Sequence, residues 1–132
     1  ALLAIDKATQ RITYAGARRP LLQLRNGEMT THDATKSSIG EVLLDGSEAV
    51  YTSTIIEPQP GDSFYMFSDG IIDQFGGPRN RKFTNKRLIR TLTDLADQPM
   101  AEQEQQLDAL MTEWMGENEQ TDDMILIGLK VG

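Results

Sequence analysis

The chain has 132 residues, 39% of them apolar, and a formal net charge of −7. This length allows one domain with one core and is too short for two. No cysteine is present, which excludes disulfides, thiolate metal sites and cysteine nucleophiles. The acidic charge argues against nucleic-acid partners, and no apolar run is long enough to span a membrane, so we expect no direct membrane contact. A reducing cytoplasm is the compartment that this composition predicts.

The first half of the sequence predicts β-strands joined by turns. Asn26 and Gly27 form a pair that readily adopts the positive φ values of a two-residue hairpin turn. The single histidine, His32, follows in a polar stretch and is expected in a solvated loop, and residues 37–47 also read as loop. The expected strands are residues 1–6, 11–17, 48–58 and 63–68, with a hairpin over 20–33; the 63–68 strand is apolar on both faces and therefore central.

The second half changes to helical periodicity after the glycine-rich "FGGPRN". Thr84 or Asn85 is suited to cap a first helix, Pro99 suits the first turn of a second, and Gly116 suits its end. The chain closes with "DMILIGLKV", which is mostly apolar on both faces and predicts an interior strand. The apolar stripes that define the helices are Leu88, Ile89, Leu92, Leu95 and Ala96, and then Leu107, Leu110, Met111 and Trp114.

Charge is unevenly distributed in this half. Six of the thirteen basic residues lie between Arg79 and Arg90, whereas residues 97–123 hold nine acids and no lysine or arginine. The simpler interpretation is a pair of solvated helix faces that attract each other. The alternative is a basic surface that docks an acidic or phosphorylated partner.

Three aspartates point to a metal site. Asp69 ends one predicted interior strand, and Asp122 and Asp123 precede another. If the two strands are antiparallel neighbours, the three carboxylates gather at one edge of the sheet, where their mutual repulsion calls for a cation. Oxygen-only ligand sets favour hard ions such as Mg²⁺ or Mn²⁺.

The Asp-Gly pair by itself is weak support for that site. Asp45-Gly46 is a second such pair, set among polar residues, and is expected to be only a turn. For Asp69 the alternative is a structural role in which the strand ends and the carboxylate caps the following "GIIDQF" turn.

Four segments in order carry a family resemblance: "YAGARRPLLQLRNGE", "GDSFYMFSDGIIDQFGGPRNRKF", "TEWMG" and "EQTDDMILIGLKV". They resemble the C-terminal part of bacterial type-2C metal-dependent serine/threonine phosphatases, in the sporulation-phosphatase-E-like branch that regulates sigma factors. The resemblance covers residues 1–131. It implies an α+β fold, an antiparallel β-sandwich flanked by helices, in which residues 1–132 form a single partial domain.

The same resemblance implies a function and a site. Relatives hydrolyse phosphoserine or phosphothreonine in a phosphoprotein with water activated by a binuclear Mg²⁺ or Mn²⁺ centre. By motif match, Asp69 and Asp122 are catalytic metal ligands, and Asp123 is the neighbouring metal-site residue. Anti-sigma-factor antagonists are the implied class of substrate.

The sequence also departs from the family. The N-terminal segments that supply the bridging carboxylate have no counterpart here, so we expect a fragment that holds one weakly bound ion or none. An exposed inner face and free strand edges then predict dimerisation or strand exchange. Where many relatives have "AGH", this chain has "AGARR"; Arg18 and Arg19 are simplest as surface residues, and contact with a phosphate is the alternative.

Two other functions stay open at this point. One is a non-catalytic module of the same fold that binds a signalling partner. The other is an aspartyl-phosphate phosphotransferase with Asp69 as the nucleophile. That chemistry favours a second acid two residues later, where this chain has Ile71, and Asp73 is too far along.

Overall fold

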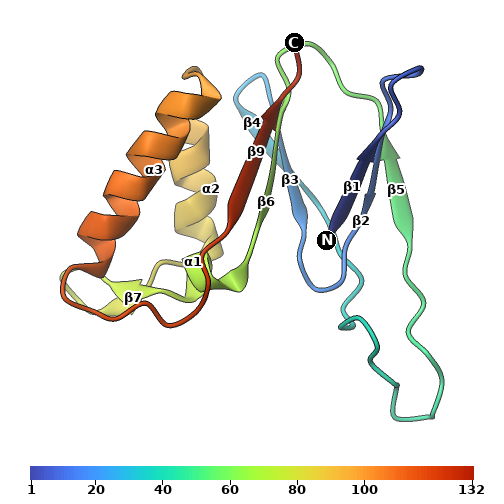
Figure 1. Ribbon diagram of the computed structural model, residues 1–132, viewed down its shortest axis with the longest axis horizontal. Helices are drawn as coiled ribbons and strands as arrows, with labels where there is room; N and C mark the ends of the chain where they lie inside the picture. Colours follow the sequence, from blue (N-terminus) through green and yellow to red (C-terminus); the bar gives the residue numbers. More distant parts are fainter.

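A computed structural model describes residues 1–132 as two facing β-sheets and a helical layer (Figure 1). One sheet has the order β1-β2-β5 and the other β4-β3-β6-β9, and all paired strands within them are antiparallel. Helices α2 and α3 cover the outer face of the four-stranded sheet. The strands are β1 Leu2–Ile5, β2 Ile12–Ala15, β3 Leu21–Arg25, β4 Glu28–His32, β5 Ser53–Ile56, β6 Ser63–Phe67, β7 Phe75–Gly76, β8 Arg81–Lys82 and β9 Leu126–Lys130; the helices are α1 Asp69–Asp73, α2 Asn85–Asp94 and α3 Met100–Met115.

The hairpins form where the turn residues predict them. β1 and β2 pair across the polar turn, from Leu2 opposite Ala15 to Ile5 opposite Ile12. β3 and β4 are joined through Asn26, whose φ of 51° lies in the left-handed region that this turn requires. The predicted antiparallel β-sandwich with flanking helices is therefore confirmed.

The space between the two sheets is filled by alternate residues of the strands. Its fully buried members are Ile12 and Tyr14 from one sheet and Leu21 and Phe64 from the other, with Ile56 at 6% exposure. Because strand side chains alternate between faces, the residues between these point away from the sandwich.

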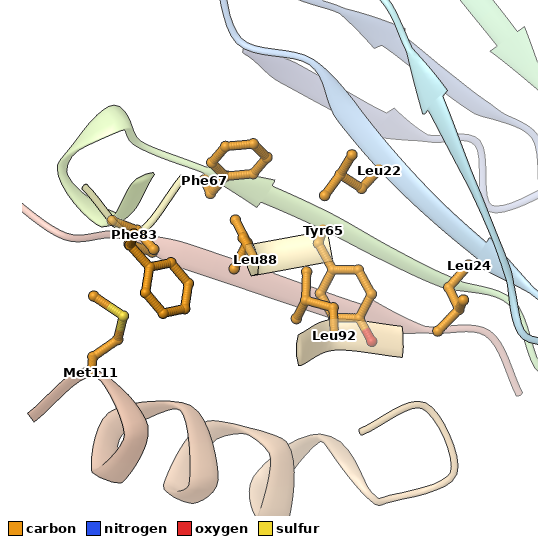
Figure 2. Packing of buried hydrophobic residues seen from close by; sticks show 9 residues of the cluster. Leu22, Leu24, Tyr65, Phe67, Phe83, Leu88, Leu92 and Met111 are labelled. Atoms are coloured by element: carbon orange, nitrogen blue, oxygen red, sulfur yellow. The ribbon is translucent and has the colours of Figure 1, made fainter. Parts of the chain in front are cut away.

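The second cluster lies between the four-stranded sheet and the helices (Figure 2). Tyr65 and Phe67 of β6 pack here, whereas Phe64 packs between the sheets, which explains why this strand is apolar on both faces. Burying each such side chain contributes about 1.5–3 kcal/mol. The cluster consists of Leu22, Leu24, Tyr65, Phe67, Ile71, Phe83, Leu88, Leu92 and Met111.

Several details differ from the sequence-based expectations. The closing strand β9 is an edge strand and not an interior one, and Ile125 and Ile127 beside and within it are each 54% exposed. His32 ends β4 with its Nε2 2.8 Å from the Gln23 side-chain oxygen, so it is not in a solvated loop. Thr84 precedes α2, but its side chain makes no capping hydrogen bond. None of the helices is long and apolar enough to cross a membrane.

Candidate functional site

Three neighbouring strands start or stop at one end of the four-stranded sheet, where the predicted acids lie. We call this end, formed by strand termini, the acidic edge. β6 pairs with β3 with Leu22 opposite Tyr65, and with β9 with Phe67 opposite Leu126. Because all three strands are antiparallel to their neighbours, β3 begins, β6 ends and β9 begins at this same edge, beside α1 (Figure 1). The condition set by the sequence, that the strands carrying the two acidic motifs are antiparallel neighbours, is therefore met.

The two acidic motifs are held together by Ser68. Its hydroxyl donates a hydrogen bond to the Asp123 carbonyl at 2.7 Å and accepts one from the Ile125 amide at 2.9 Å. Its own amide donates to the Ile125 carbonyl at 2.9 Å. A Cβ on Gly70 would overlap the Asp123 carbonyl oxygen, so the close approach requires glycine at this position. The residues of "SDG" therefore fix the backbone of "TDDM" directly.

Asp69 begins the short helix α1 and is 41% exposed at its side chain. The structural alternative, in which its carboxylate caps the following turn, is not what the structure shows. The carboxylate instead forms an ion pair with the guanidinium of Arg19, fifty residues earlier in the chain. Arg19 lies two residues before the start of β3, which explains how it reaches this edge.

Asp122 and Asp123 lie on the exposed segment that leads into β9. The Asp122 carboxylate accepts a hydrogen bond from the Asp123 amide at 2.7 Å. The structure thus brings the two acidic segments together, but it does not gather their carboxylates: residues 1–132 contain no group of three His, Cys, Asp or Glu side chains that could hold a metal ion.

Gln74 is a residue of this region that the sequence did not single out. It is fully buried, and its side-chain amide donates to the Glu119 carbonyl at 3.0 Å and accepts from the Thr121 amide at 3.2 Å. These bonds fasten the segment that carries Asp122 to the end of α1. No local pattern signals such a role, because a glutamine at the end of a helix normally faces solvent.

Trp114 explains the "TEWMG" motif at the end of α3. Its indole N–H donates to the Gln74 carbonyl at 3.1 Å, and its own carbonyl accepts from the Gly77 amide at 2.7 Å. The Arg87 guanidinium stacks over its ring at 4.1 Å from the ring centroid. The basic segment therefore packs on α3 through this stacking, and no ion pair joins it to the acidic residues 97–123.

The second Asp-Gly pair gives a contrast. Asp45 accepts hydrogen bonds from the Ser47 hydroxyl at 2.6 Å and the Ser47 amide at 2.9 Å, and these bonds lower the pKa of its carboxyl. It lies in an exposed turn, as predicted, in the segment between β4 and β5.

Comparison with known proteins adds the family. The family model for stage II sporulation protein E (SpoIIE) matches residues 1–132. A comparison with curated proteins finds no match. Among solved structures, the SiaA-PP2C domain of Pseudomonas aeruginosa is similar with a TM-score of 0.86 and 29% identity, over 98% of this chain and 50% of that one.

Two further structures support the fold. The phosphatase domain of the cell fate determinant SpoIIE from Bacillus subtilis has a TM-score of 0.69 at 16% identity, over 98% of this chain and 56% of that one. The serine/threonine phosphatase PstP/Ppp of Mycobacterium tuberculosis has a TM-score of 0.59 at 18% identity, over 98% of this chain and 57% of that one. The chain spans about half the length of these solved domains. With this fold and a family-model match over residues 1–132, the chain belongs to the SpoIIE family of PP2C-type phosphatase domains.

Proposed function

We propose that residues 1–132 are one partial domain of a Mg²⁺- or Mn²⁺-dependent protein serine/threonine phosphatase. Asp69 and Asp122 are its metal ligands, with Asp123 alongside. The observation that carries this proposal is the hydrogen bonding between "SDG" and "TDDM", in which the Ser68 hydroxyl bonds the backbone on both sides of Met124. Such hydrogen bonds fix the positions of two backbone segments, as is needed where carboxylates from different strands bind one ligand.

The carboxylate donors fit the proposed ions in chemical type, but they are too few to complete a metal site. Asp69, Asp122 and Asp123 offer carboxylate oxygens, which hard divalent ions prefer. Three such side chains do not converge within residues 1–132, so further ligands would have to come from the part of the domain that has no counterpart here. When bound, the metal centre supplies an activated water for attack on phosphorus.

The role of this half of the domain is then to position ligands. Ser68 and Gly70 set the distance between the two acidic segments, and Gln74 fastens the second segment through its bonds to Glu119 and Thr121. The substrate we propose is a phosphoserine or phosphothreonine in a protein, in the reducing cytoplasm, with anti-sigma-factor antagonists as the class that the family resemblance suggests.

A second candidate is a non-catalytic module of the same fold that binds a signalling partner. The observation that favours it is the ion pair in which Arg19 already neutralises Asp69, in a chain where the acids do not converge. Metal binding separates the two candidates, because only the phosphatase requires it.

The test is calorimetric titration of Mn²⁺ into the wild-type chain and its Asp69→Asn variant, with hydrolysis of a phosphoserine peptide measured in parallel. We expect Mn²⁺ to bind the wild type weakly and Asp69→Asn to lose that binding. Asp45→Asn is the matched control, because it changes the other Asp-Gly pair, and it should bind as the wild type does. Binding by Asp69→Asn equal to that of the wild type would contradict the proposal.

A further inference from the structure

Arg19 is the one basic side chain that the structure brings to the acidic edge of the sheet as an ion-pair partner of Asp69. The phosphatase proposal gives it no role. The two residues are fifty positions apart, and the pair exists only because β3 begins where β6 ends.

The backbone of Arg19 is held firmly in place. The hydroxyl of Tyr14, itself 1% exposed, donates to the Arg19 carbonyl at 2.5 Å. A Cβ on Gly16 would overlap both of those oxygens, so this loop folds tightly against the buried tyrosine. The adjacent Arg18 amide donates to the Thr35 carbonyl at 2.7 Å. Arg19 therefore extends from a fixed base, as a pre-organised binding group does.

The guanidinium of Arg19 still has donors to offer. An arginine carries five N–H donors, and here only Nη2 makes a hydrogen bond, to Asp69. The side chains of Arg19 and Asp69 are 32% and 41% exposed, so solvent reaches the pair. A planar guanidinium with free N–H groups binds phosphate in a bidentate manner better than any other side chain.

We propose that Arg19 binds the phosphoryl group of the substrate at this edge and that Asp69 holds the arginine there until the substrate arrives. The inference rests on the proposed function, because it takes the phosphoprotein as the ligand. Arg19 exchanges one anionic partner for another, the Asp69 carboxylate for the phosphoryl oxygens. Any cation that occupies Asp69 frees the guanidinium, so cation binding and phosphate binding strengthen each other.

The neighbouring Arg18 gives the matched comparison. Its Nε donates to the Ser38 hydroxyl at 2.7 Å and its Nη2 to the Glu41 carboxylate at 3.2 Å. Arg18 therefore binds the loop of residues 38–41 and has no contact with Asp69. The two arginines have the same charge and adjacent positions, so a general effect of net charge must appear equally in both.

The test is calorimetric titration of inorganic phosphate and of a phosphoserine peptide, each with and without Mn²⁺, into the wild type, Arg19→Gln and Arg18→Gln. Loss of a charge-assisted hydrogen bond predicts that Arg19→Gln weakens phosphate binding about 10-fold or more. Arg18→Gln should change it less than about 2-fold, because exposed charges contribute little. Mn²⁺ binding by Arg19→Gln should be as strong as in the wild type or stronger, since a competing cation is gone.

Three results would overturn the inference: no phosphate binding by the wild type, phosphate binding that Arg19→Gln leaves unchanged, or equal losses in the two arginine variants. A loss of Mn²⁺ binding or of the cooperative unfolding transition in Arg19→Gln would show a structural role instead. The proposed function fails separately, when Asp69→Asn leaves Mn²⁺ binding intact. If Mn²⁺ binding requires Asp69 but phosphate binding ignores Arg19, only the present inference is wrong.

Discussion

The two ends of β6 carry the same pair of groups in opposite settings. Asp62, before the strand, is 1% exposed and receives two hydrogen bonds from Arg25, at 2.6 and 2.8 Å. Asp69, after the strand, is 41% exposed and meets only Arg19. Both aspartates pair with an arginine near an end of β3. The Asp62–Arg25 pair, whose carboxylate is buried, is called the closed pair, and the solvent-exposed Asp69–Arg19 pair is called the open pair.

The closed pair satisfies the whole carboxylate. The Gln23 side chain and the Gln59 amide donate to Asp62 at 3.0 and 2.9 Å, in addition to Arg25. The Arg25 guanidinium, more than any other group, lowers the pKa of the Asp62 carboxyl, so this group stays ionised. A buried charge costs several kcal/mol unless it is bonded in this way. The contrast teaches that Asp62 serves stability, whereas the unsatisfied acceptors of Asp69 are free for a ligand.

The largest effect that tests this contrast is on stability. Asp62→Ala removes the buried carboxylate that Gln23 and Arg25 bind and should lower the free energy of unfolding by about 3 kcal/mol. Asp69→Ala should change it by less than about 1 kcal/mol, because its pair is exposed. Urea unfolding followed by the fluorescence of the single tryptophan, Trp114, measures both. Equal losses in the two variants would show that the edge with Asp69 is also a structural site.

Gln74 gives the next effect, because it is the buried residue that supports the open end. Gln74→Leu removes the bonds to Glu119 and Thr121 and should cost about 2 kcal/mol. The amide of Thr121 should then exchange with solvent much faster, in a hydrogen-exchange experiment. Gln106→Leu, on the exposed side of α3, is the control and should change neither quantity. Unchanged exchange at Thr121 would mean that Ser68 alone holds this segment.

Much of this arrangement could be predicted from the sequence, because local patterns encode it. The Asn26 turn, the strand β6 with apolar residues on both faces and the glycine that ends α3 each depend on neighbouring residues only. The positions of "SDG" and "TDDM" at strand ends were also readable, but that the two motifs meet depended on their strands being antiparallel neighbours, which the structure shows. The partners of the charged and polar side chains could not be predicted in this way, because Arg19 meets Asp69, and Gln74 meets Thr121, only after distant strands have paired.

The strand β9 and the residue His32 are two cases in which the local sequence pattern predicted the wrong environment. The apolar pattern of β9 predicts burial, but pattern alone does not supply a neighbouring strand, and the structure places β9 at an edge. The polar stretch around His32 predicts exposure, but the hairpin register sets Leu21 opposite His32 and brings its ring to Gln23.

His32 provides the smallest predicted effect; its ring is connected to the closed pair only through Gln23, which also bonds Asp62. Burial lowers the pKa of its imidazole in the folded chain. Near and below about pH 6.5 the unfolded chain therefore binds more protons than the folded chain, and the free energy of unfolding decreases as the pH is lowered. The loss should therefore begin between pH 7 and 5.5, before the Asp62 carboxyl, with its lowered pKa, takes up a proton.

This loss should be smaller than the effect of Asp62→Ala and should be visible as a shift of the urea midpoint to lower concentration. His32→Gln keeps a hydrogen-bonding side chain beside Gln23 and removes the titration, so its midpoint should stay constant from pH 7 to 5.5. The midpoint of Asp69→Ala should still fall as the wild type does, because the His32 ring bonds Gln23, whereas the Asp69 carboxylate bonds Arg19. A pH dependence that survives His32→Gln but disappears in Asp69→Ala would reverse the assignment and place the acid-sensitive group at the open edge.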